Sequence, residues 1–175
     1  MYRYAPNSTL KANHAVWGDF CNALVKDMRP LYLLAFLLTA NHQEAEQCFA
    51  MVLEAASEAT VFRDWVRPWI RRTLIKVAIH GVLRRPGDNG QTSDSWWDSD
   101  AGASFNSVAQ LGSLERLVFV MAVLEGYSIK ECSLLLDRSE RAVVTARLHA
   151  LKDLRSDRAP GISLATNGDK LQICR

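Results

Sequence analysis

The sequence predicts an all-α protein made of two small helical domains. Apolar residues recur every three to four positions over most of the 175 residues, and no segment alternates strictly over the length of a strand. A stretch rich in Gly, Ser, Asp and Asn at 86–107 interrupts this pattern and has the composition of a flexible linker. We therefore expect one domain over 1–85, a second over 108–155, and a disordered tail over 156–175.

The first domain is expected to open with two helices of different character. An amphipathic helix begins near Val16 and ends near Pro30. The next helix, over 31–40, is nearly all apolar. A helix that is apolar all round is buried on all sides, so this one is expected at the centre of its domain.

Two further helices complete the first domain. Asn41, followed by Glu44, is a suitable cap for a third helix over 43–56. The fourth runs over 62–83 and contains Pro68. Because proline lacks a backbone N–H, we expect Pro68 either to kink this helix or to lie in the first turn of a restarted one.

Three helices are expected in the second domain. The first covers 114–124 and stops before Gly126. The second covers 129–136, and Ser128 is its cap. The third starts after Ser139 and extends to residue 155.

The last two helices of this domain have the order of a helix-turn-helix. A short helix, a tight turn at Asp137 and Arg138, and a longer polar helix follow one another. Asp137 occupies the turn position where glycine is commonest, and aspartate tolerates the left-handed backbone better than most residues.

Composition excludes several classes of protein. Hydrophobic residues make up 49% of the chain, so it has enough apolar side chains to build a core. The longest apolar run, 31–40, has half of the roughly 20 residues that a membrane span needs. The first residues lack the pattern of a signal peptide, so a cytoplasmic protein without membrane insertion is expected.

No pattern of residues suggests catalysis or cofactor binding. The four cysteines and four histidines are scattered, without the spacing of metal ligands, so we expect reduced cysteines in the core and no metal. The chain has neither a phosphate-binding loop nor a catalytic triad. We expect no enzyme activity, no cofactor and no small-molecule substrate.

The segment 114–155, LERLVFVMAVLEGYSIKECSLLLDRSERAVVTARLHALKDLR, resembles the DNA-binding fourth region of bacterial RNA polymerase sigma factors. It is most similar to the small extracytoplasmic-function (ECF) type. The matching positions are Glu115, Arg116, Val118, Phe119, Glu125, Gly126, Ser128, Glu131, Leu135, Ser139 and Val143.

The first domain resembles the second region of the same family. The similar segments are LYLLAFLLTANHQEAE at 31–46 and FRDWVRPWIRR at 62–72. The resemblance implies a sigma factor that binds core RNA polymerase and promoter DNA to start transcription. An anti-sigma factor is a further partner that the family suggests.

The last helix has side chains suited to reading duplex DNA. Arg141, Val144 and Thr145 share a face near its N-terminus, where arginine can pair with guanine and methyl groups can touch thymine. Further duplex contacts, mostly to phosphates, are expected from Lys130, Arg138, Ser139 and Lys152. A solvated basic helix face is the alternative interpretation.

A second set of DNA contacts is expected in the most basic part of the chain, where seven basic residues and one acidic residue fall within 61–85. Cations interleaved with aromatic rings suit an unpaired DNA strand, because bases stack on rings while cations follow the backbone. The residues are Arg63, Trp65, Arg67, Trp69, Arg71, Arg72 and Lys76. The alternative places at least two of the rings at 62, 65 and 69 in the core.

The third helix departs from the family pattern. By resemblance, polymerase docking falls on Glu44, Gln47, Ala50 and Met51. The family carries acidic and amide groups at the last three positions, and here only Gln47 partly replaces them, so weak or altered docking is expected. In the last helix, Arg147 aligns with a position that is usually apolar.

Two alternatives to an ordinary sigma factor stay open. One is a divergent sigma-like DNA-binding regulator without productive polymerase docking. The other is an interaction protein whose sigma-like domains bind a protein such as an anti-sigma factor.

Overall fold

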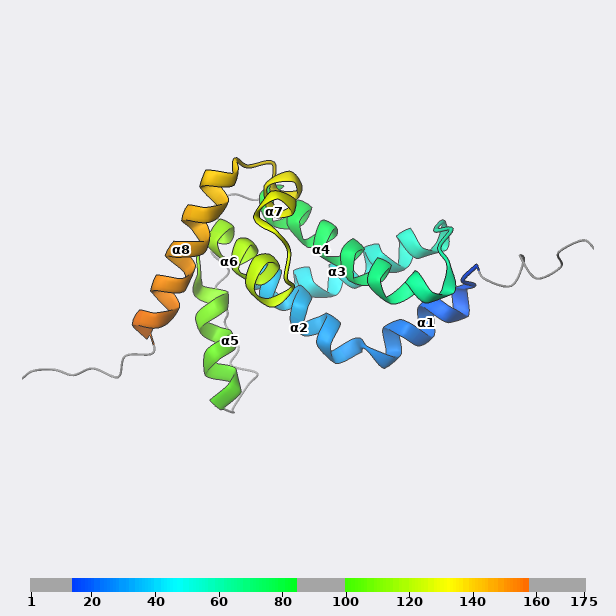
Figure 1. The fold of residues 1–175 in the computed structure, drawn as a ribbon. Coiled ribbons are helices and arrows are strands. Elements are labelled where there is room, and N and C mark those ends of the chain that lie inside the picture. The colour runs from blue at the N-terminus through cyan, green and yellow to red at the C-terminus, as the bar shows by residue number, and fades with distance from the viewer. Residues whose placement is uncertain (1–13, 85–99, 158–175) are drawn as a thin grey trace, which may run out of the picture.

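The computed structural model describes residues 14–84 and 100–157, and helices are its only regular elements within these ranges, which confirms the all-α prediction (Figure 1). An isolated β-bridge joins His14 to Phe62. The elements are α1 (Trp17–Lys26), α2 (Met28–Thr39), α3 (His42–Ser57), the 3₁₀ turn η2 (Arg63–Trp65), α4 (Val66–Arg84), α5 (Asp100–Gln110), α6 (Ser113–Phe119), the π-helical segment η3 (Val120–Leu124), α7 (Ile129–Leu136) and α8 (Glu140–Asp157).

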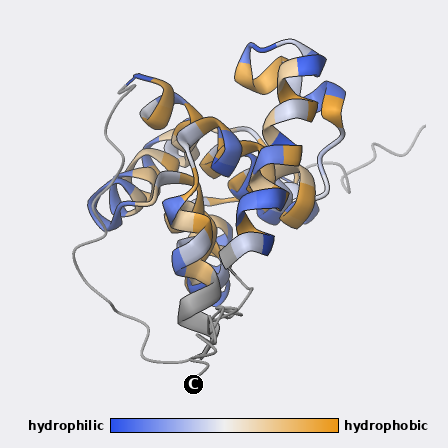
Figure 2. Cartoon of the chain, turned by 90° about the vertical axis from the view of Figure 1, so that its left-hand side faces the viewer, coloured by the Kyte–Doolittle hydropathy of each residue, from blue (hydrophilic) through white to orange (hydrophobic). Residues whose placement is uncertain are grey.

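The helix α2 lies at the centre of the molecule, as its apolar sequence predicts. It packs against α3 and α4 on one side and against α5 and α6 on the other. Every side chain from Leu34 to Ala40 is buried. Elsewhere hydrophobic and hydrophilic residues alternate along the helices, as expected of amphipathic helices that bury one face (Figure 2).

Two of the prolines, Pro30 and Pro68, lie at helix starts. Pro68 lies in the first turn of α4, directly after η2, so the helix restarts there and is not kinked. Pro30 lies in the first turn of α2, and α1 has already ended at Lys26. The sequence-based end near Pro30 was therefore a few residues too late, because proline is compatible with the first turn of the next helix.

The expected linker at 86–107 is wrong in its last part, because α5 is helical from Asp100 onward. The polar composition hid a short apolar face: Val108 and Ala109 are buried, and Phe105 packs beside them at helical spacing. Residues 85–99, which include the rest of the linker, and 158–175, which include most of the tail, lie outside the described residues.

The helix-turn-helix forms as predicted, from α7 and α8. Ser128 caps α7: its Oγ accepts from the Glu131 N–H (3.2 Å), and its own N–H donates to Glu131 Oε2 (2.9 Å). Asp137 adopts the left-handed conformation (φ 51°) that the tight turn needs. Ser139 Oγ accepts from the Ala142 N–H (3.2 Å) at the start of α8.

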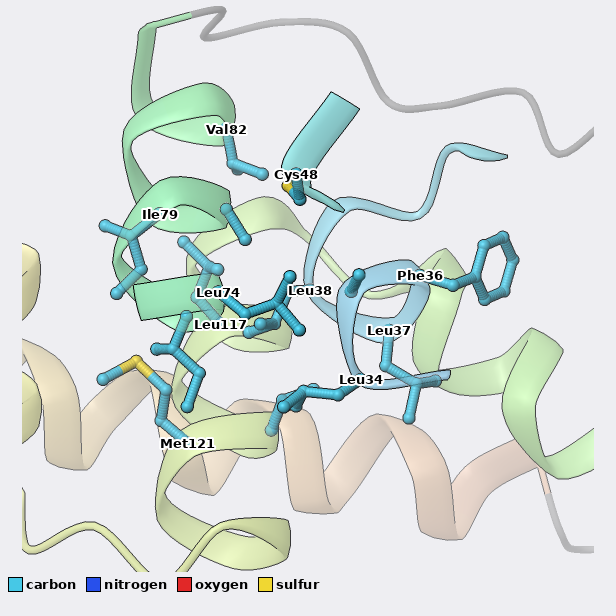
Figure 3. Close-up of a cluster of buried hydrophobic side chains, with 14 of the residues drawn as sticks. Leu34, Phe36, Leu37, Leu38, Cys48, Leu74, Ile79, Val82, Leu117 and Met121 are labelled. Carbon is cyan, nitrogen blue, oxygen red and sulfur yellow. The ribbon is translucent and has the colours of Figure 1, made fainter. Parts of the chain in front are cut away.

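One continuous core joins the two halves of the chain. Figure 3 shows Leu38 of α2, Leu74 of α4 and Leu117 of α6 gathered in it, with Met121 of η3 at its edge. All four side chains are fully or almost fully buried. The two halves are thus packed together through α2.

No helix in the described ranges has both the length and the apolar composition that a membrane span requires.

Candidate nucleic-acid interface

One face of α8 is exposed along most of its length. Arg141, Val144, Thr145 and Lys152 all lie on it and are exposed, as the sequence predicts; the Val144 side chain is 42% exposed. The opposite face carries Val143, Ala146 and Ala150, which are 0–3% exposed and pack against the rest of the domain. We call the exposed side the recognition face: Arg141, Val144, Thr145, Leu148 and Lys152.

Sequence reasoning missed Leu148 on this face. Its side chain is 61% exposed, although leucine is usually buried. The signal was available, because Leu148 follows Val144 by four residues and Arg141 by seven, so the three share one side of a helix.

Arg147 does not take the place of an apolar core residue, as its position in the family alignment suggested. Arg147 is exposed, and the neighbouring Ala146 is the residue that points into the core, at 3% exposure. The core position therefore remains apolar, shifted by one residue from the ungapped alignment.

The remaining predicted duplex contacts lie on α7 and the turn. Lys130 is exposed in the first turn of α7, and Arg138 is exposed in the turn between the two helices. Ser139 is also exposed, but its hydroxyl oxygen accepts a hydrogen bond from the Ala142 N–H and thereby caps α8.

Three basic side chains of the predicted strand-binding segment are held in ion pairs. The pairs are Arg63 Nε with Asp19 Oδ2 (3.2 Å), Arg67 Nε with Asp27 Oδ2 (3.1 Å) and Arg71 Nη2 with Glu125 Oε1 (2.6 Å). The hydrogen bonds that Arg71 donates to the Glu125 carboxylate raise the pKa of Arg71 against the opposing effect of burial. The other two cations of the segment, Arg72 and Lys76, are exposed on α4.

The aromatic rings of this segment are mostly on the surface. Phe62 is 56% exposed and Trp65 is 64% exposed, so the alternative that places at least two of the three rings in the core is wrong. Trp69 is half-buried and meets the Phe20 ring edge to face, with centroids 5.4 Å apart.

These rings line a groove of about 790 Å³ between the two halves. The first half supplies Phe62, Trp65 and Trp69, and the second half supplies Tyr127. Cationic and acidic groups border the same groove: Arg71, Arg72, Glu58, Glu125 and Glu131.

The predicted docking face on α3 is exposed and partly apolar. Gln47 and Ala50 are exposed, Met51 is 51% exposed, and Glu44 is half-buried. A small groove of about 250 Å³ separates this face from α4, and its lining includes Glu44, Gln47, Met51, His80 and Arg84. Beneath it, burial and the nearby Glu44 charge raise the pKa of the Cys48 thiol to about 11.

Sequence reasoning also missed the structural role of Arg116, although the residue matches the family pattern. Its side chain is 2% exposed and binds main-chain carbonyls of both halves. It donates to Leu38 O (3.2 Å) and Thr39 O (3.4 Å) at the end of α2. It also donates to Ala109 O (3.2 Å) in the last turn of α5 and to Leu111 O (3.1 Å) directly after that helix. Burial lowers the pKa of Arg116, while the Glu44 charge opposes this effect.

One solved structure has a fold similar to that of this chain. The structure described as "Co-crystal structure of the sigma factor RpoE in complex with the anti-sigma factor NepR from Bartonella quintana" is 14% identical to this chain. The match covers 79% of this chain and 96% of that one, with a TM-score of 0.49. No curated protein sequence matches the chain.

The family comparison concerns the second half. Residues 106–154 match the family model described as Sigma-70, region 4. This range contains the end of α5, all of α6 and α7, and α8 up to its last three residues. The match confirms the sigma-factor resemblance seen in the sequence. Residues 106–154 are therefore similar to sigma-70 region 4, and this similarity supports a role of the chain in transcription initiation.

Proposed function

We propose that the chain is a sigma factor that directs RNA polymerase to specific promoters. The observation that carries this proposal is the recognition face of α8, exposed on the second helix of a helix-turn-helix within the region 4 match. In such a motif the second helix enters the major groove. In this role the chain selects the promoter and catalyses no reaction itself.

The side chains of this face suggest a division of labour in duplex binding. Arg141 lies near the N-terminus of α8, where side chains reach base edges. Lys152 lies three turns further along, at a distance suited to the phosphate backbone. Lys130 and Arg138 are proposed as further phosphate contacts.

The first half is proposed to hold the unpaired promoter strand. Trp65, Arg72 and Lys76 are exposed and offer one ring and two cations. Trp69, which lines the groove between the two halves, offers a second, half-buried ring. Arg63, Arg67 and Arg71 are proposed to join these contacts once their ion pairs exchange a carboxylate for a phosphate.

Core polymerase is the proposed partner of α3, through Glu44, Gln47, Ala50 and Met51. The exposure of Met51 and Ala50 favours a second candidate function, that of a sigma-like DNA-binding regulator without productive polymerase docking. An anti-sigma factor is a further proposed partner, in line with the complex in which the structural neighbour was solved.

Reconstituted transcription tests the proposal. Core polymerase with the full chain is expected to initiate on a subset of a promoter-fragment library. Arg141→Ala should relax base preference, because a groove-facing arginine discriminates bases by about 1–3 kcal/mol. Lys152→Ala should weaken binding on all sequences and lower its salt dependence.

The controls separate the two candidate functions. Sequence-specific duplex binding without initiation would favour the regulator. No binding to duplex DNA even at low salt would contradict both candidates.

A further inference from the structure

Two aliphatic side chains lie in the middle of the recognition face. Val144 is 42% exposed and Leu148 is 61% exposed, one helical turn apart. Single exposed apolar residues are common on protein surfaces. This pair differs in its setting, because Arg141 precedes it and Lys152 follows it on the same side of α8.

The cations at both ends restrict what this face can bind. Arg141 and Lys152 suit an anionic partner with phosphate groups at its edges. Between such edges, the major groove offers one apolar group, the C5-methyl of thymine. Aliphatic side chains set against any other base edge would cover hydrogen-bonding groups without replacing their water.

We propose that Val144 and Leu148 bind the C5-methyl groups of two thymines in the duplex element that α8 reads. This inference rests on the proposed function, since it assumes that the recognition face lies in the major groove. It adds Leu148 to the recognition residues and specifies the bases opposite the pair.

Helix geometry sets the spacing of these bases. Four residues of α8 advance about 6 Å along its axis, and base pairs are stacked about 3.4 Å apart. The two thymines should therefore lie about two base-pair steps apart. Arg141, three residues before Val144, should contact a guanine about one step from the first thymine.

An interface with a second protein is the competing occupant of this pair. Two aliphatic side chains are far fewer than the roughly 20–30 residues per side of a stable protein interface. The pair also lacks an apolar surround, because cations flank it. The observations therefore favour DNA, and a protein partner becomes an outcome of the test.

The test removes single methyl groups from the DNA. The full chain first selects its element from a library of random duplexes. Each thymine of that element is then replaced by deoxyuridine, which lacks only the C5-methyl. Binding should weaken about fourfold at each of two positions, the effect expected for one buried methylene-sized group, and stay unchanged at the other positions.

Protein variants assign each methyl group to a side chain. Leu148→Ala should abolish the difference between thymine and deoxyuridine at one position, and Val144→Ala should abolish it at the other. Leu134→Ala is the matched control, because Leu134 is 73% exposed on α7 and lies outside the recognition face. It should retain both differences.

Three results would overturn the inference. Selection of an element that shows no deoxyuridine effect would leave the proposed function intact and remove the methyl contacts. The same deoxyuridine effects in Leu148→Ala and Val144→Ala as in the unmodified chain would do so too. Loss of self-association or of polymerase binding in these variants, with DNA binding unchanged, would assign the pair to a protein partner. Failure to select any element would instead contradict the proposed function.

Discussion

Arg71 of α4 and Glu125, which follows η3, form an ion pair with two hydrogen bonds between the two halves of the chain. The Glu125 side chain is 8% exposed and that of Arg71 is 45% exposed. Arg71 also lines the groove between the two halves, beside the rings proposed to bind an unpaired strand. The Glu125 carboxylate of the second half thus pairs with a cation of the first half that we propose as a contact to DNA phosphates.

Glu125→Gln is expected to strengthen binding of single-stranded DNA. The change removes the negative charge beside Arg71 and leaves a side chain of the same size. Because the pair is partly exposed, the loss of folding stability should stay at about 1 kcal/mol or less. Fluorescence anisotropy with a labelled oligonucleotide measures the affinity. Glu46→Gln, an exposed change on α3, is the control for net charge, and an equal gain in both variants would contradict the local explanation.

Arg116→Met is expected to destabilise the whole chain. The substitution removes the donor shared by four main-chain carbonyls, and a hydrogen bond to a charged group contributes about 1.5–3 kcal/mol. With partial relaxation, a total loss of about 2–4 kcal/mol is expected in urea denaturation. The same measurement tests cooperativity: the unmodified chain should unfold in one transition, because its core is continuous, and Arg116→Met should separate the halves into two.

Arg116→Lys gives the specificity control for this prediction. A lysine ammonium offers three donors at one point, whereas the guanidinium spreads five over a planar fork. Lysine should therefore restore only part of the stability. Full restoration would show that charge alone, without the fork, joins the halves.

The docking face of α3 leads to a binding prediction. If its apolar residues weaken docking, the double variant Ala50→Gln/Met51→Glu should bind core polymerase more tightly than the unmodified chain. Each polar group of the partner left unpaired costs about 1–3 kcal/mol, so restoring two partners should tighten binding by between about 30-fold and about 20,000-fold. A titration of core polymerase measures it. Tight binding by the unmodified chain, unchanged or worsened by the variant, would contradict weak docking.

Cysteine reactivity tests the packing beneath this face. Cys48 and Cys132 are buried and the pKa of each thiol is raised by burial, whereas Cys21 is only half-buried. In a Cys174→Ser background, a thiol reagent at pH 8 should modify Cys21 quickly and the other two slowly. Addition of urea should make all three react together, and fast modification of Cys48 in the folded chain would contradict its burial.

The Cys48 thiol also sets a direction for stability against pH. Its pKa in the folded chain, about 11, exceeds the ordinary value of 9.0. The unfolded thiol therefore loses its proton first as the pH rises, and the free energy of unfolding should fall between pH 9 and 11. Cys48→Ala should reduce this fall, which urea titrations at several pH values would detect.

Local signals in the sequence predicted the helices where they were strong. The caps at Asn41, Ser128 and Ser139 and the turn at Asp137 all form in the structure. The start of α5 was missed, because a composition rich in Gly, Ser and Asp outweighed the short apolar face that packs on α2.

The candidate site was predicted unevenly for a similar reason. The exposed residues of α8 follow from helical periodicity, since one face of a single helix decides them. The ion pairs of Arg63, Arg67 and Arg71 join residues 40 or more positions apart and have no local signal. The same holds for Arg116, whose carbonyl partners in α2 depend on how the two halves meet.

The packing of Arg116 on the end of α2 has a consequence for synthesis on the ribosome. Arg116 follows Leu38 by 78 residues in the chain. Synthesis proceeds at roughly 5–20 residues per second, so roughly 4–16 s separate Leu38 from Arg116. Only after this time can α6 pack on the apolar side of α2. During that interval the nascent first half exposes the side of α2 that includes Leu38. We therefore expect chaperones that hold apolar nascent segments to bind the first half after α2 has emerged and before α6 has emerged.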